Sequence, residues 1–193
     1  MQFPIGTKVR AKGFNKVFEV ESFDEATHKY ILKDSVPTWD ENELELAQPR
    51  LRGFEVATSF EDRGVILPIR STVGSAGYDF RVLTDDSITI NPNETHVFDT
   101  GVKAYMQDDE VLLIYVRSSL GIKSKIRLAN GTGVIDSDFE LPIKVALHNY
   151  GEYPIVINNG DRVAQGIFTK YLITDDDNVT TSRIGGIGST GVS

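Results

Sequence analysis

The chain has 193 residues, of which 40% are hydrophobic and 25% are charged, and its net charge is −8. This acidic balance argues against a protein that binds along a nucleic-acid backbone, because phosphate contacts need clustered Lys and Arg. The absence of cysteine excludes disulfides and thiolate zinc sites, and the start "MQFPIGTKVR" lacks the long apolar run of a signal peptide or membrane span. We therefore expect a cytoplasmic protein that binds neither membranes nor nucleic acid, although a few local cations suffice for a single nucleotide.

The first part of the chain predicts a small β-barrel over residues 1–48, with a boundary near "AQPRLRG". The runs "GTKVRAKG" and "KVFEVESFDEATHKYILKD" resemble consecutive strands of a Tudor or chromo type barrel, and "WDENELEL" would form its last turn and strand. Some barrels of that kind bind peptides or nucleic acid through aromatic cages. We expect Phe14, Tyr30 and Trp39 in the core instead, because so short a barrel needs its aromatic residues inside. The sequence leaves the role of this accessory module open.

The remaining residues, 53–193, predict a second all-β domain. Short apolar or alternating runs such as "HVFDTGVKAYM", "EVLLIYV", "IKVALHNY" and "RVAQGIFTKYLI" recur between turn signals such as "NPNE", "QDDE" and "NNGD". No amphipathic helix of convincing length interrupts them. Many short strands at this spacing favour a sandwich, jelly roll or barrel over alternating strands and helices.

Two short motifs in this domain place polar groups at strand ends. In "SAGYDFR", small residues followed by Tyr78 and Asp79 fit a tight strand entry, which alone is a weak signal. In "VRSSLGIK", Arg117, Ser118 and Ser119 directly follow the apolar run "EVLLIYV" and present hydrogen-bond donors to an anion. A capped turn explains the second motif equally well.

Two further motifs follow along the chain. In "NGTGVIDSDFE", the pair Asn-Gly between strands is a strong hairpin signal, and the strand ends on Asp136 where the sheet opens. A carboxylate beside phosphates can act as a general base towards water if it lies within hydrogen-bond reach, but the turn-rich "DSD" also suits a simple turn. In "GDRVAQGIF", a turn leads into a strand that carries Gln165.

The C-terminal stretch "SRIGGIGSTGVS" has one arginine and four glycines among small hydroxyl residues. Such a segment cannot build a core, so either it frays, as termini commonly do, or it orders over a ligand.

Taken in order, the five motifs resemble those of the trimeric dUTP diphosphatases (dUTPases), from about Gly53 to the C-terminus. The resemblance implies a homotrimer of distorted all-β jelly rolls of the β-clip type, with active sites shared among subunits and a mobile arm over about 180–193. It also implies hydrolysis of dUTP to dUMP and pyrophosphate, with Mg²⁺ bound to the triphosphate. The first fifty residues are not part of the resemblance.

The resemblance assigns roles to individual residues. Asp136 would activate the water that attacks the α-phosphorus, and Asp79 would reach the metal through water or brace the neighbouring aspartate, with no direct protein ligand to the metal. Asn130 and the backbone of 133–135 would read uracil, while Arg183 would bridge to the γ-phosphate. The full set implied to bind substrate is Arg117, Ser118, Ser119, Asn130, Gly133, Val134, Ile135, Phe139, Lys144, Gln165, Arg183, Ile187, Gly188 and Ser189.

The chain departs from the family pattern at three positions. Ile187 replaces an aromatic residue that stacks on uracil, Phe139 replaces a tyrosine that packs on the deoxyribose, and Leu141 stands where a glycine is common. An aliphatic side chain loses stacking worth roughly 1 kcal/mol or more.

We therefore predict that this chain closes weakly over its substrate and that Ile187→Phe lowers KM. Steady-state kinetics of the variant beside the parent checks this, and an unchanged or higher KM would count against it.

Two other functions fit parts of the sequence. The related dCTP deaminases also carry an R-S-S-L stretch, but deamination needs a glutamate in the strand after the hairpin, and "KVALHNY" supplies none. A regulatory role is the other alternative, in which the tail or the barrel binds a regulatory protein, as phage-encoded members of the family do. Such a role can coexist with catalysis.

Overall fold

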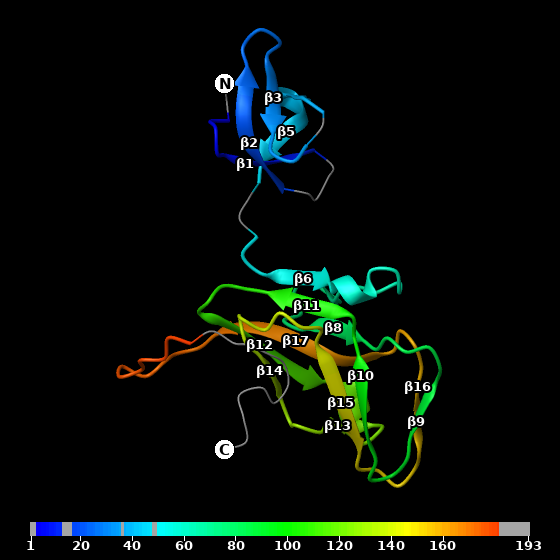
Figure 1. The fold of residues 1–193 in the computed structure, drawn as a ribbon. Coiled ribbons are helices and arrows are strands. Elements are labelled where there is room, and N and C mark those ends of the chain that lie inside the picture. Colours follow the sequence, from blue (N-terminus) through cyan, green and yellow to red (C-terminus); the bar gives the residue numbers. More distant parts are fainter. Residues whose placement is uncertain (1–2, 13–16, 36, 48–49, 182–193) are drawn as a thin grey trace. The chain divides into compact units, whose positions relative to one another are not determined.

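A computed structural model describes residues 3–12, 17–35, 37–47 and 50–181. The chain divides into two compact units, residues 1–50 and 51–193. The regular structure of both units consists almost entirely of short antiparallel strands (Figure 1), and α1 (Ser118–Ile122) is the one α-helix in the described ranges. The prediction of an all-β protein is confirmed. No helix in the described part of the chain is long and apolar enough to cross a membrane.

The first unit is a five-stranded antiparallel sheet in the order β4-β3-β2-β1-β5. Its elements are β1 (Lys8–Ala11), β2 (Val17–Asp24), β3 (Lys29–Leu32), β4 (Trp39–Asp40), the 3-10 helix η1 (Glu41–Glu43) and β5 (Leu44–Leu46). Alternating residues of β1 and β3 are buried, which is the period expected for strands with one face on a core.

The aromatic residues of this unit serve its core. Tyr30 is fully buried, and its hydroxyl donates to Oε2 of Glu41 at 2.9 Å and accepts from the backbone N–H of Phe3 at 3.2 Å. Trp39 is half-buried against the same cluster, and its Nε1 donates to Oγ of Ser35 at 3.2 Å. Tyr30 is therefore a core residue as predicted, whereas Phe14 lies outside the described residues.

The second unit contains four sheets in its described part. The largest has the order β14-β12-β17-β8-β7, and the smaller ones are β10-β15-β13, β11-β6 and β16-β9. The strands are β6 (Gly53–Val56), β7 (Ile69–Arg70), β8 (Tyr78–Arg81), β9 (Ile88–Ile90), β10 (Thr95–Asp99), β11 (Val102–Tyr105), β12 (Glu110–Val116), β13 (Ile126–Leu128), β14 (Gly133–Ile135), β15 (Lys144–Asn149), β16 (Ile155–Ile157) and β17 (Arg162–Lys170); a 3-10 helix, η2 (Thr58–Phe60), follows β6.

One apolar core joins these sheets. It draws buried residues from the strands of all four, including Phe80 of β8, Leu112 of β12, Leu147 of β15 and Ile157 of β16. Phe54 of β6 packs edge-on against Phe80, with the ring centroids 5.3 Å apart. This core holds β12 and β17 in the middle of the largest sheet, and the polar motifs occur at the ends and edges of that sheet.

A charged pair ties the start of the second unit to its sheet. Glu110 at the beginning of β12 is buried and accepts from Nε of Arg52 at 2.9 and 3.0 Å. The backbone N–H of Gln107 also donates to this carboxylate, at 3.2 Å. Chiefly through the hydrogen bond from Arg52, the pKa of Glu110 lies below its usual value.

We predict that Glu110 contributes a pH-dependent part of the stability. A lowered pKa in the folded state means that the contribution is complete above the ordinary glutamate value of about 4.3 and is lost as pH falls through the folded value. Glu110→Gln should therefore lower Tm at neutral pH, and the difference from the parent should shrink in acid. Thermal unfolding of both proteins between about pH 3 and pH 7 measures this; a Tm difference that does not vary with pH would contradict it.

Candidate active site

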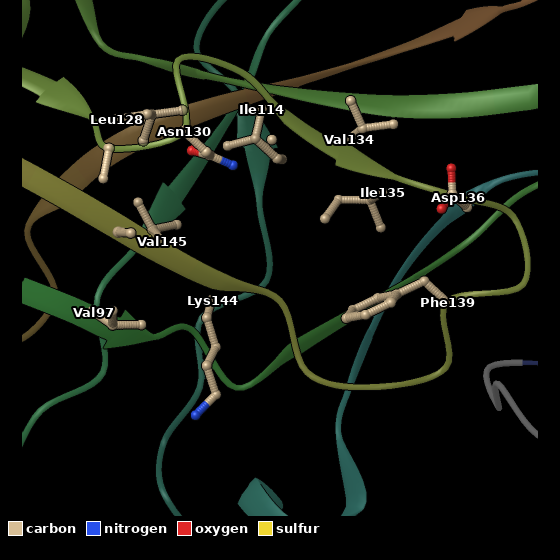
Figure 2. Close-up of a pocket in the computed structure, with 13 residues that line it drawn as sticks. Val97, Ile114, Leu128, Asn130, Val134, Ile135, Asp136, Phe139, Lys144 and Val145 are labelled. Atoms are coloured by element: carbon tan, nitrogen blue, oxygen red, sulfur yellow. The ribbon is translucent and has the colours of Figure 1, made fainter. Parts of the chain in front are cut away.

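β14 and the turn that joins it to β13 form one wall of a cavity of about 570 Å³ (Figure 2), which we call the hairpin cavity after the sequence prediction. The predicted hairpin itself does not form, because β13 pairs with β15 while β14 pairs with β12 in another sheet. The turn between the strands contains the predicted Asn-Gly pair, and Gly131 has φ of +74°, a conformation that glycine adopts without strain. Gly133 then pairs with Ile114 of β12, so closely that a Cβ at this glycine would lie 3.1 Å from Cβ of Ile114. The absence of a side chain at Gly133 thus lets β14 lie directly against β12.

Seven of the predicted site residues line this cavity. They are Asn130, Gly133, Val134, Ile135, Asp136, Phe139 and Lys144. Ile114, Leu128, Val97 and Val145 supply most of the remaining wall, which is apolar. Figure 2 shows Asn130, which precedes β14, and Asp136, which follows it, on opposite sides of the cavity, with the side chains of Ile135 and Phe139 nearer to Asp136. The cavity therefore combines an apolar interior with an amide and a carboxylate.

Lys144 lines the same cavity but does not direct its charge towards Asn130 or Asp136. Its ammonium points away from Asn130 and Asp136 in Figure 2, and Nζ lies 3.2 Å from Oδ1 of Asp99. In this arrangement the charge of Lys144 is paired with an aspartate of β10, directly across the β10–β15 ladder.

The other predicted polar residues line a second cavity, of about 420 Å³. It contains Asp79, Arg117, Ser118, Ser119 and Gln165 together with Ser71, Ser75, Ala76, Gly77 and Ile167. Arg117 follows β12 and precedes α1, while Gln165 of β17 pairs with Asp79 of β8 on one side and Tyr115 of β12 on the other. Strand pairing therefore brings together three motifs that lie far apart in the chain.

Asp79 lies at the centre of this second cavity and is only 11% exposed. Its Oδ1 lies 2.9 Å from Nε of Arg117, and its Oδ2 lies 3.0 Å from Nη1 of Arg162. Ser71 also donates its hydroxyl to Oδ2, at 3.2 Å. Both oxygens of the carboxylate are thus engaged by protein donors, which a buried carboxylate requires.

The two cavities have no lining residue in common, so Asp136 and Asp79 lie in different ones. Four residues predicted to bind substrate, Arg183, Ile187, Gly188 and Ser189, lie outside the described residues. Arg162 and Ser71 are not among the residues that the sequence motifs predicted for the site. The sequence did offer a signal for Arg162, because this residue lies in the motif "GDRVAQ" together with Gln165. The contact of Ser71 with Asp79 could not be predicted in this way, because it depends on the pairing of β7 with β8.

Gly77 lies against the side chain of Gln165 in this cavity, and a substitution there tests the role of that amide. A Cβ at this position would collide with Oε1 of Gln165 and lie 3.2 Å from its Cβ. We predict that Gly77→Ala displaces the amide of Gln165 and raises KM for a phosphate-bearing substrate by about tenfold, since a charge-assisted hydrogen bond is worth about 1.5 kcal/mol or more. Steady-state kinetics measures the change, and circular dichroism establishes that the fold is retained. A KM equal to that of the parent would show that Gln165 accommodates the methyl group.

Comparison with known proteins identifies the family. A family model described as dUTPase matches residues 63–191. The deoxyuridine 5'-triphosphate nucleotidohydrolases of Lactococcus lactis subsp. lactis and Haemophilus influenzae are each 40% identical to this chain, over 74% and 65% of it and over 99% and 87% of their own lengths.

Solved structures show the same likeness. The crystal structure of dUTPase from Streptococcus mutans shares 38% identity and a TM-score of 0.57, and the match covers 64% of this chain and 98% of that one. A mutant dUTPase from phage phi11 of S. aureus, at 18% identity and a TM-score of 0.57, shares the fold over 67% of this chain and 97% of that one. By its motifs, its fold and its relatives, this chain belongs to the dUTPase family.

Proposed function

We propose that this protein hydrolyses dUTP to dUMP and pyrophosphate, which limits uracil in DNA and supplies dUMP for dTMP synthesis. The observation that carries the proposal is the hairpin cavity, because it places an amide, an exposed strand edge and a carboxylate around a space large enough for a nucleoside. Membership of the dUTPase family supports the same reaction.

Uracil would be read by the β14 edge. In the described residues β14 is the last strand of its sheet, so its outer backbone groups are not used by a neighbouring strand. Together with the amide of Asn130, these groups can pair with uracil as a second base would. A wrong base leaves buried polar groups unpaired, at a cost of roughly 1–3 kcal/mol each. Phe139, with 9% exposure, would pack on the deoxyribose and leave no room for a 2′-hydroxyl.

The triphosphate would lie against the second cavity. Arg117, Ser118, Ser119 and Gln165 offer guanidinium, hydroxyl and amide donors to its oxygens. Lys144 would add a substrate contact through the N–H donors of its ammonium that are not directed at Asp99. In the reaction, Asp136 accepts a proton from water while the water oxygen bonds to the α-phosphorus. The bond from that phosphorus to the oxygen bridging to the β-phosphorus breaks, and pyrophosphate leaves.

A homotrimer with shared sites accounts for the separation of the two cavities. Base-side and phosphate-side residues line different cavities of one chain. Apposition of a cavity from one subunit with the other cavity of its neighbour would assemble a complete site. In the same proposal, the arm carrying Arg183, Ile187, Gly188 and Ser189 closes over the nucleotide and excludes water.

The donor set is compatible with a magnesium ion held mainly by the substrate. The described residues contain no group of three or more His, Asp or Glu side chains that could hold a metal ion by themselves. Both oxygens of Asp79 already form ion pairs with arginines, and Oδ2 also accepts from Ser71, so this carboxylate would reach an ion through a water. When bound, the ion neutralises phosphate charge. One related phage dUTPase is described as coordinating a structural Mg(II) ion.

Release of pyrophosphate from dUTP, beside dCTP, dTTP and UTP with Mg²⁺, tests this proposal, with light scattering to measure the oligomer. We expect hydrolysis of dUTP alone by a trimer. Ammonia release from dCTP would favour deamination, and a folded trimer inactive on all four nucleotides would overturn the enzymatic proposal.

Binding of a regulatory protein is the second candidate function. The family match begins at residue 63, so the first unit lies outside it. Structural relatives that share the fold at 17% identity include phage dUTPases described as controlling transfer of virulence genes. A pull-down with and without dUTP tests this role, because a partner that depends on the arm should respond to nucleotide. Retention of no protein in either condition would count against it.

A further inference from the structure

Arg162 has no role in the reaction proposed above, but it contacts a residue of the phosphate-side cavity. It begins β17, and its Nη1 pairs with Oδ2 of Asp79 across 83 residues of sequence. The opposite oxygen of the same carboxylate pairs with Nε of Arg117. One aspartate thus lies between two guanidinium groups, and we call Arg117, Asp79 and Arg162 the carboxylate clamp.

The backbone around Arg162 holds Arg117 as well. The N–H of Arg117 donates to the carbonyl of Val163 at 3.2 Å, and its Nη1 donates to the carbonyl of Arg162 at 3.4 Å. A guanidinium has five N–H donors. One of those of Arg117 donates to the Arg162 carbonyl, and Nε forms the ion pair with Asp79, so the N–H groups of Nη2 and the second one of Nη1 can bind phosphate oxygens. The contacts with Asp79 and β17 therefore set the direction in which Arg117 presents its donors.

The clamp also affects the charge at the second cavity, which Arg117 and Asp79 line and which Arg162 reaches only through Asp79. Two guanidinium groups and one carboxylate leave an excess of one positive charge beside Ser118, Ser119 and Gln165. Without Arg162, the charges of Arg117 and Asp79 would cancel, and a largely buried carboxylate would lose one of its two cationic partners. Asp79 would then repel phosphate oxygens and would be free to turn away from Arg117.

We propose that Arg162 is a positioning residue for the triphosphate: through Asp79 it orients Arg117 and keeps the phosphate cavity cationic. The inference rests on the proposed function, since it takes the second cavity as the phosphate site. It gives Asp79 the role of linking the two arginines, which is compatible with an outer contact to a water on the metal.

The test compares Arg162→Gln and Arg162→Lys with the full-length parent. Arg63→Gln is the matched control, because Arg63 also pairs with an aspartate in the same unit, but its partner Asp85 lines neither cavity, whereas Asp79 lines the second one. Calorimetry measures affinity for dUMP and for a non-hydrolysable dUTP analogue with an imido bridge between the α- and β-phosphorus. Steady-state kinetics with dUTP and thermal unfolding are measured on the same preparations.

We expect Arg162→Gln to lose about tenfold in affinity for the triphosphate analogue, with KM raised, while affinity for dUMP changes much less. Arg162→Lys, which keeps the charge but not the planar fork, should lie between Arg162→Gln and the parent. The control should match the parent. Equal losses for both ligands, or no loss for the analogue, would overturn the proposal; if Arg162→Gln does not fold, the same comparison is made with Arg162→Lys.

These measurements separate the two proposals. A parent that binds the analogue but does not hydrolyse dUTP would overturn the proposed function, while the affinities of the variants would still decide the role of Arg162. A parent that binds neither ligand would overturn both.

Discussion

Replacing Asp136 by asparagine is expected to lower kcat for dUTP by about 10²–10⁴-fold, the usual contribution of a general base. The amide keeps the size of the carboxylate but cannot accept the proton of the attacking water. Because Asp136 lines the hairpin cavity at the end of β14, affinity for the imido analogue should change little. Pyrophosphate release under steady-state conditions measures kcat, and calorimetry measures binding.

Asp138→Asn is the matched control for this variant. Asp138 lies two residues further along the same segment and is exposed, but it does not line the hairpin cavity. We expect it to retain most of the parental kcat. Equal losses in the two variants would show that the segment needs negative charge in general, and would remove Asp136 from its role as base.

The largest expected effect on stability belongs to Gly166→Ala. Gly166 lies in the middle of β17, between Tyr78 of β8 and Ile114 of β12. A Cβ there would lie 2.7 Å from Cε2 of Phe80 and 2.9 Å from Cδ1 of Leu112, both of which are fully buried. Overpacking of this kind costs about 1–3 kcal/mol of unfolding free energy. Denaturant titration at one fixed protein concentration measures the loss, because oligomer stability depends on concentration.

Gly74→Ala provides the comparison. A Cβ at Gly74 would meet nothing within 4 Å. Its unfolding free energy should stay within about 0.5 kcal/mol of the parent, as for other surface substitutions. If Gly166→Ala were as stable as Gly74→Ala, the prediction would be wrong, and the core around Phe80 would accommodate the methyl group without loss of unfolding free energy.

Much of this protein follows from its sequence alone. Alternating apolar residues predicted the strands, as in "IKVALHNY", where Val145, Leu147 and Asn149 of β15 are buried and the residues between them are not. The order of five short motifs identified the family before any contact was known. The Asn-Gly pair predicted a tight turn with Gly131 at positive φ, because that requirement is local. The hairpin expected around this turn is wrong, because β13 pairs with β15 and β14 pairs with β12, in different sheets.

Other features depend on the tertiary structure. The run "HVFDTGVKAYM" contains two strands, β10 and β11, in different sheets, and the chain turns at Gly101 with φ of +68°. The hydroxyl of Thr100 donates to the carbonyl of Ile143 at 2.7 Å beside this turn. Alternation alone does not show which sheet a strand joins, because that depends on how the sheets pack around their common core.

The candidate site shows the same division. The motifs predicted that the substrate-binding and catalytic residues include Asp79, Arg117, Gln165 and Asp136, since residue type and local spacing can be read directly from the sequence. Tertiary structure alone paired β8 with β17, placed Arg162 and Arg117 on opposite oxygens of Asp79, and put Asp136 in a separate cavity. Residues distant in sequence meet only where strand register and core packing bring them together, and one segment of sequence does not determine that register.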